Sequence, residues 1–182
     1  KTGETNLIGV LVSSATGKTL SAYLSEKIWK PFVMDQDAVW MLGPTGHEIS
    51  GCCVSASLRD YARFGLFILG GGVAGGEKVL PDDWLADATT TIRNASVSAS
   101  DKVPANRTVT GYTAGNDGYH LHRWMPQAPR AFGHAGAGGQ LCWVDPDSGM
   151  SIAFLHDTLH MDPRVEFHRA ADINSLALRL VD

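Results

Sequence analysis

The most informative stretch of this sequence is Ser57-Leu58-Arg59-Asp60-Tyr61-Ala62-Arg63-Phe64-Gly65. A serine three residues before an acidic residue is typical of a helix N-terminus, because both side chains can pair with backbone N–H groups of the first turn. The apolar residues of the stretch and its continuation recur at helical spacing: Leu58, Tyr61, Phe64 and Ile68. Three consecutive glycines, residues 70–72, then end the pattern. The stretch predicts an amphipathic helix over residues 58–69.

Two shorter helices and a loop are predicted before this helix. Apolar residues between positions 7 and 11 mark a first helix, which Gly17 can end. Thr19 suits the N-cap of a second helix, and Pro31 blocks its continuation. Residues 35–56 contain several glycines and a proline, so we expect a loop with short extended pieces there.

One more helix and a long loop are predicted before the pattern changes from helical to extended. Pro81 suits the first turn of another helix, with Asp82 and Asp83 at its positively polarised end. Residues 94–117 are rich in Ser, Thr, Asn and Gly and predict a long surface loop. The remaining elements are four strands, a turn and a helix: strands 118–125, 131–135, 139–145 and 150–156, the turn 145–149 and the helix 164–181. Helices, then antiparallel strands, then a terminal helix predict an α+β fold.

Composition and charge narrow the possible functions. The chain has 182 residues, a formal net charge of −4 and no run rich in Lys or Arg, which argues against a nucleic acid partner. No apolar run approaches the roughly 20 residues of a transmembrane helix, so no membrane span is predicted. The three cysteines, Cys52, Cys53 and Cys142, lack metal-binding spacing. Their odd number predicts no disulfide framework, and we interpret them as small buried hydrophobic residues. The cellular compartment stays open.

A glycine-rich segment is the candidate functional site: Phe132-Gly133-His134-Ala135-Gly136-Ala137-Gly138-Gly139-Gln140. One interpretation is a plain hairpin with a histidine at the surface. The other is the edge of an active-site strand, where small residues let a substrate lie against the backbone and a free N–H points at a developing oxyanion. The composition of the segment alone leaves both interpretations open.

Other motifs carry less weight. Residues 15–19 end like a phosphate-binding loop, but Val12 stands where the first glycine belongs. Lys1-Thr2-Gly3 spells the K-T-G box of β-lactamases in front of a predicted helix rather than on a strand, so we interpret it as coincidence. Histidines and acids near residues 120–122 and 156–162 have no third ligand at a fixed spacing. We therefore predict neither a metal nor a cofactor.

Several ordered motifs resemble the family of class C β-lactamases, family VIII carboxylesterases and 6-aminohexanoate-dimer hydrolases, a penicillin-binding-protein-like group. They are residues 5–18, residues 26–38, the helix 57–65, and Gly138-Gly139-Gln140 followed by Val144-Asp145-Pro146. Val33 stands where that family usually has glycine. The resemblance covers nearly the whole chain.

The resemblance implies a β-lactamase/transpeptidase-like fold, an antiparallel sheet flanked by helices, which is incomplete in this chain. Residues 1–182 would then be the C-terminal part of a single hydrolase domain. Residues 1–117 would be mainly helix and loop, and residues 118–182 would supply sheet strands and the C-terminal helix. We expect the natural protein to begin upstream of Lys1 and its missing N-terminal part to be the partner of this chain.

The resemblance also implies roles for single residues. His134-Ala135-Gly136 is the counterpart of the K-T-G box, and the backbone N–H of Ala137 would form half of the oxyanion hole. These positions make His134, Gly136 and Ala137 the expected catalytic residues. The expected substrate-binding residues are Ala135, Trp124 and Gly138, although Trp124 is equally compatible with packing.

The catalytic serine and tyrosine of that family have no counterpart in this sequence. No serine is followed by lysine three residues later, and no Tyr-x-Asn occurs. The expected function is therefore the C-terminal part of a serine hydrolase that acts on a carboxylic ester or short amide, with the nucleophile outside this chain. The alternatives are a β-lactamase or D-Ala-D-Ala peptidase-like enzyme, and a non-catalytic fragment or binding module. The substrate would be a small molecule.

Overall fold

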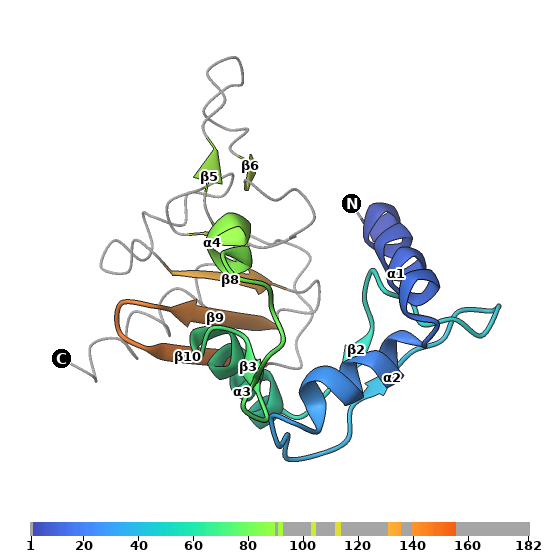
Figure 1. Ribbon diagram of the computed structural model, residues 1–182, viewed down its shortest axis with the longest axis horizontal. Helices are drawn as coiled ribbons and strands as arrows, with labels where there is room; N and C mark the ends of the chain where they lie inside the picture. Colours follow the sequence, from blue (N-terminus) through green and yellow to red (C-terminus); the bar gives the residue numbers. More distant parts are fainter. Residues whose placement is uncertain are drawn as a thin grey trace.

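The computed structural model describes residues 2–89, 91–92, 103–104, 112–113, 131–135 and 140–155 (Figure 1). The elements are α1 Thr2–Thr16, α2 Leu20–Leu24, the π-helix η1 Ser25–Trp29, β1 Val39–Trp40, β2 Val54–Ser55, α3 Leu58–Leu69, β3 Val73–Ala74, β4 Glu77–Lys78, α4 Trp84–Thr89, β5 Thr91–Ile92, β6 Val103–Pro104, β7 Tyr112–Thr113, β8 Phe132–Ala135, β9 Leu141–Asp145 and β10 Met150–Phe154.

The main sheet of the described chain has four antiparallel strands in the order β10-β9-β8-β7. Strands β9 and β10 form a hairpin in which Val144 pairs with Ser151. The hairpin turn is closed by Asp145, whose carboxylate accepts hydrogen bonds from the N–H groups of Asp147 and Ser148 and from the Ser148 hydroxyl. With helix α3 against this sheet, the prediction of an α+β fold is confirmed.

Helix α3 lies unusually close to the sheet because Gly65 carries no side chain. A Cβ on Gly65 would overlap the Ser151 hydroxyl and lie 3.4 Å from a methyl of Val144. The Ser151 hydroxyl instead donates to the Ala62 carbonyl of α3 at 2.9 Å. On the other side of α3, Phe67 is only 1% exposed and its ring meets that of Phe32 edge-on. Helix α3 thus joins the sheet to the segment that precedes β1.

The N-terminus of α3 is held by a fully buried carboxylate. Asp60 is 0% exposed and accepts hydrogen bonds from the Asp35 N–H at 2.6 Å and the Gln36 N–H at 3.1 Å. Ser57 caps the helix as predicted, because its hydroxyl accepts from the Asp60 N–H and donates to the Asp60 carboxylate. Burial opposes ionisation of Asp60, but these hydrogen bonds and the Arg63 charge outweigh it, so the pKa of Asp60 is lowered.

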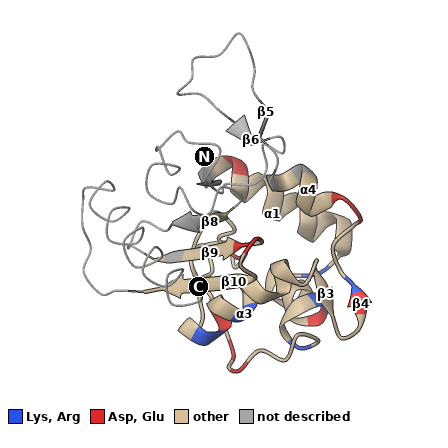
Figure 2. Ribbon diagram, turned by 90° about the vertical axis from the view of Figure 1, so that its left-hand side faces the viewer, with Lys and Arg blue, Asp and Glu red and all other residues tan. Residues whose placement is uncertain are grey.

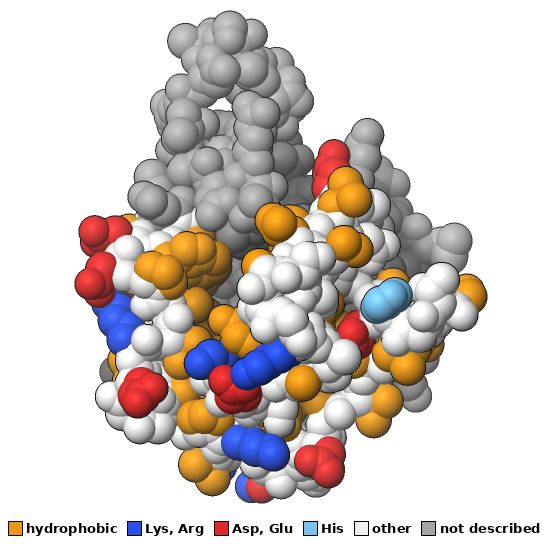
Figure 3. Space-filling model, turned by 45° about the vertical axis from the view of Figure 1, so that its right-hand side comes forward, with side chains coloured by type: hydrophobic (Ala, Val, Ile, Leu, Met, Phe, Trp, Pro, Cys, Tyr) orange, Lys and Arg blue, Asp and Glu red, His pale blue; other side chains and the backbone are white. Residues whose placement is uncertain are grey.

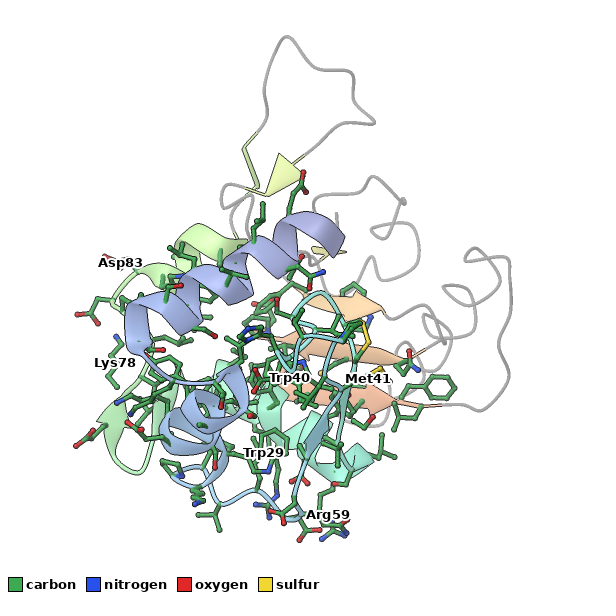
Figure 4. All side chains as sticks on the ribbon, turned by 90° about the vertical axis from the view of Figure 1, so that its right-hand side faces the viewer. Trp29, Trp40, Met41, Arg59, Lys78 and Asp83 are labelled. Carbon is green, nitrogen blue, oxygen red and sulfur yellow. A yellow bond between two sulfur atoms is a disulfide. The ribbon has the colours of Figure 1, made fainter. Side chains whose placement is uncertain are left out.

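Helices α1 and α2 form an arm beside the sheet (Figure 1). Helix α1 ends at Thr16 before Gly17, and the Thr19 hydroxyl caps α2 by accepting from the Ala22 N–H, so both predictions are confirmed. The segment 35–56 contains the predicted short extended pieces, β1 and β2, which pair with each other. Two indole N–H groups secure this region (Figure 4): Trp29 donates to the Gln36 carbonyl, and Trp40 to the Ile49 carbonyl.

Three predictions are wrong. Helix α4 begins at Trp84 rather than at Pro81, because Asp83 has a left-handed φ of 62° and interrupts the helical backbone. The range predicted as a surface loop, 94–117, contains β6 and β7, and β7 belongs to the main sheet. Cys52 and Cys53 form a disulfide, made possible where the φ of Cys53 is 79°, rather than two independent buried thiols. The predicted strand 118–125 and helix 164–181 lie outside the described residues.

Within the described part of the chain, no single helix is long and apolar enough to cross a membrane. Helices α1 and α2–η1 meet that criterion only as a pair bent by 71°. Figure 2 shows the positions of the basic residues along the described ribbon interspersed with acidic ones rather than gathered in one segment.

Replacing Val33 with glycine should stabilise the fold. The turn after η1 is a Schellman motif, in which the Val33 N–H donates to the Lys30 carbonyl and the Met34 N–H to the Trp29 carbonyl. Val33 occupies the left-handed position of this motif with a φ of 54°, although its side chain is 71% exposed. Relief of that strain exceeds the entropy cost of glycine, so Val33→Gly should raise the free energy of unfolding by about 0.5–1 kcal/mol in urea denaturation. Val39→Gly, at an equally exposed strand residue, should lower it.

Replacing Asp60 with asparagine should destabilise the fold, and the loss should depend on pH. An amide cannot accept every hydrogen bond of the carboxylate, so Asp60→Asn should lower the free energy of unfolding by about 2–4 kcal/mol near neutral pH. Because the folded pKa is lowered, the carboxylate stabilises above the unfolded pKa and loses that effect as pH falls through the folded value. The difference from the unmodified protein should therefore shrink below about pH 4.

The exposed Asp37, two residues from the Asp35 N–H, offers a matched control. Asp37→Asn should leave the urea midpoint almost unchanged at every pH. Equal effects of the two substitutions would refute the role assigned to Asp60.

Candidate functional site

The candidate site is built on strand β8, which lies between β7 and β9 in the sheet. The β8 backbone pairs Gly133 with Trp143, His134 with Cys142, and Ala135 with Leu141. The structure therefore places two of the predicted site residues, His134 and Ala135, together on a sheet strand. Gly136, Ala137, Gly138 and Trp124 lie outside the described residues, so their predicted roles stay predictions.

Strand β8 lies on a tightly packed neighbour. Trp143 and Val144 of β9 are both 4% exposed, and Ala131 just before β8 is 1% exposed. A Cβ on Gly133 would overlap the Cys142 carbonyl oxygen and lie 3.0 Å from the Cα and from a ring carbon of Trp143. Sequence reasoning treated Gly133 only as one of several small residues. The structure shows that glycine is required there for β8 to keep its distance from β9.

Cys142, which pairs with His134, has a half-buried thiol. Its Sγ donates to the Tyr61 carbonyl of α3 at 3.6 Å. Burial raises the pKa of the Cys142 thiol to about 11, so the group is a neutral thiol near pH 7 and not a nucleophile. For Cys142 the interpretation as a small buried hydrophobic residue agrees with this burial, and the residue serves to pack α3 on the sheet.

Tyr61 is not a candidate general base either. Burial, and to a lesser degree Cys142, raises the pKa of the Tyr61 hydroxyl. That hydroxyl donates to the Val54 carbonyl at 2.7 Å, which favours the protonated form. Tyr61 therefore ties β2 to α3.

Polar groups elsewhere in the described residues are also used in packing. The Ser50 hydroxyl donates to the Thr5 carbonyl at 3.0 Å, and the Glu48 carboxylate accepts from the Ser21 hydroxyl at 2.6 Å. Lys18, in the loop between α1 and α2, pairs with Glu26 of η1, which agrees with a structural role for the segment that mimics a phosphate loop. No group of three or more His, Cys, Asp or Glu residues is arranged for a metal ion in the part of the chain that the structure describes.

The family of this chain follows from a match along most of its length. The Beta-lactamase family model matches residues 2–175. The chain belongs to the beta-lactamase family. It is 29% identical to the 6-aminohexanoate-dimer hydrolase of Paenarthrobacter ureafaciens over 164 residues, which are 88% of this chain and 39% of that protein. It is 30% identical over 112 residues to the esterase/beta-lactamase LipL of Mycobacterium tuberculosis, covering 62% of this chain and 24% of LipL.

Solved structures agree on the fold of this beta-lactamase family member. A candidate 6-aminohexanoate-dimer hydrolase from Bacillus anthracis superposes with a TM-score of 0.74 at 23% identity, covering 99% of this chain and 43% of that structure. A family VIII carboxylesterase gives a TM-score of 0.59 at 17% identity, covering 91% of this chain and 55% of that structure. At these identities the neighbours establish a β-lactamase/transpeptidase-like fold. The chain spans less than half the length of the curated relatives it matches.

Adding one methyl group at Gly133 should displace the candidate strand. Because the new Cβ would overlap the backbone of β9, Gly133→Ala should cost about 1–3 kcal/mol in the free energy of unfolding, measured by urea denaturation. Gly3→Ala is the matched control, because nothing lies within 4 Å of a Cβ there. That control should be neutral or slightly stabilising in helix α1. An unchanged urea denaturation curve for Gly133→Ala would show that β8 and β9 are not packed as described.

Proposed function

We propose that this chain supplies the oxyanion strand of a serine hydrolase that cleaves a carboxylic ester or a short amide through an acyl-enzyme. The observation that carries the proposal is the position of β8. In a member of the beta-lactamase family, the strand His134-Ala135 lies within the antiparallel sheet and leads directly into Gly136-Ala137-Gly138. A backbone N–H on such a strand can be aimed at a developing oxyanion with no reorganisation at the moment of reaction.

The reaction needs a Ser-x-x-Lys motif, which this chain does not contain, and a tyrosine base. In the proposed mechanism a serine Oγ from the remainder of the hydrolase attacks the substrate carbonyl, and a lysine and a tyrosine from the same part move its proton. The Ala137 N–H and the N–H of the nucleophile hold the oxyanion. The alcohol or amine then leaves with a proton, and water hydrolyses the acyl-enzyme to release the acid.

His134 favours an ester or short amide over a β-lactam. A lysine at this position would present a permanent positive charge to a substrate carboxylate, whereas a histidine is largely neutral near pH 7. The similarity of the chain to a 6-aminohexanoate-dimer hydrolase and, in fold, to a family VIII carboxylesterase supports this preference. The word beta-lactamase in the name of LipL supports the second candidate, a β-lactamase, which hydrolysis of a chromogenic cephalosporin would reveal.

The test removes the proposed N–H donor from the complete hydrolase, in which this chain is joined to the part that carries the nucleophile. Ala137→Pro deletes the donor, and loss of one such donor lowers kcat by about 10²–10³-fold. Ala137→Gly keeps the N–H and is the matched control, for which we expect nearly unchanged kcat on a chromogenic short-chain ester. A thermal melt checks that the proline variant is folded. His134→Ala should reduce activity less and alter the acid limb of the pH profile.

This chain alone should neither turn over the ester nor be labelled on serine by a fluorophosphonate, because it contains no Ser-x-x-Lys. Labelling of a serine together with turnover of the ester would refute the proposal that the nucleophile lies outside this chain. Full activity in a folded Ala137→Pro variant would instead mean that the glycine-rich segment is only a hairpin turn and does not bind the oxyanion.

A further inference from the structure

Helix α1 directs its small and polar residues toward the rest of the molecule. Gly9 is buried, and a Cβ there would overlap Ser50. The Ser50 hydroxyl donates to the Thr5 carbonyl at 3.0 Å, and the Asn6 side-chain oxygen accepts from the Gly51 N–H at 2.8 Å. The helix is thus attached to the loop before β2 by hydrogen bonds and close backbone approach, and Ile8 and Val12 are half-buried beside these contacts.

The opposite face of α1 is apolar and exposed. Leu7, Val10 and Leu11 are 71%, 63% and 67% exposed, and their spacing of three and four residues places them on one side of the helix. Figure 3 shows hydrophobic side chains exposed on the side of the molecule to which α1 belongs. A surface helix of a globular protein normally turns its apolar stripe toward the core. On α1 this second apolar stripe stays largely uncovered by the described part of the chain, and such a face requires a partner.

We infer that the α1 face formed by Leu7, Val10 and Leu11 docks the polypeptide that completes the β-lactamase-like domain. The chain spans 39% of the Paenarthrobacter hydrolase and 43% of the Bacillus anthracis structure, so more than half of the length of these two proteins has no counterpart in it. The inference rests on the proposal that the catalytic groups lie in that part, but it concerns assembly and not the reaction.

The charge on α1 favours a protein occupant over a lipid surface. The helix carries a single charged residue, Glu4, and no Lys or Arg. Helices that lie in a membrane interface usually combine their apolar face with basic residues that meet anionic lipids. An uncharged apolar stripe of helical spacing instead fits the packed interior between two parts of one domain.

The test co-expresses this chain, carrying an affinity tag, with the polypeptide encoded directly upstream of the codon for Lys1. The two should co-purify as a one-to-one complex. Leu7→Gln/Leu11→Gln should weaken the complex by about tenfold or more in Kd, because two leucines lose their apolar contact. Both residues are exposed and glutamine is a good helix former, so the circular dichroism of the variant should match that of the unmodified chain.

Leu58→Gln/Leu66→Gln is the matched control, because both leucines are 48% exposed on α3. This pair should leave the Kd unchanged. The inference is overturned if the upstream polypeptide does not bind, if the α1 variant binds as tightly as the unmodified chain, or if two copies of this chain pair through α1 and exclude it. A complex that forms as expected but hydrolyses neither ester nor amide would count against the proposed function alone.

Discussion

The buried carboxylate of Asp60 is the constraint on which the rest of the described structure depends. A carboxylate with no exposure to water is costly unless its oxygens are paired, and here the partners come from two segments of the chain. The Asp35 and Gln36 N–H groups come from the loop before β1, and Ser57 comes from the helix cap itself. Arg63, one turn further along α3, donates to the Val33 carbonyl of the same loop. The start of α3 and the end of the helical arm are therefore fixed together.

From this point the position of the candidate strand follows step by step. Helix α3 meets the sheet at Gly65, where the Ser151 hydroxyl reaches the Ala62 carbonyl. Ser151 pairs with Val144 in the β9–β10 hairpin, and Val144 pairs in turn with Phe132 at the start of β8. The backbone that carries His134 is thus located by a series of close contacts that begins at one charged group. None of these contacts involves a residue expected to touch substrate.

Local patterns in the sequence predicted most helices and strands. The features that these patterns missed depend on pairing between distant parts of the sequence. The caps at Thr19 and Ser57, the end of α1 before Gly17 and the strands β8, β9 and β10 all follow from signals within a few residues. Strand β7 has only two residues, Tyr112 and Thr113, and exists because β8 pairs with it from a distant part of the sequence. No periodicity can appear in two residues. For the site, the motif located β8, whereas the steric need for Gly133 depends on Trp143 across the sheet.

The disulfide between Cys52 and Cys53 differs in kind from the cross-links that stabilise secreted proteins. A bridge between distant cysteines restricts the unfolded chain, and its effect grows with the number of residues in the closed loop. A bridge between neighbours encloses one peptide unit and removes little entropy from the unfolded ensemble. Its influence is local, between Gly51, which donates to Asn6 of α1, and the Cys53 carbonyl, which accepts from the Met41 N–H. Reduction of this disulfide would remove a local restraint on the backbone between helix α1 and β2. It would leave the long-range covalent connectivity of the chain unaltered.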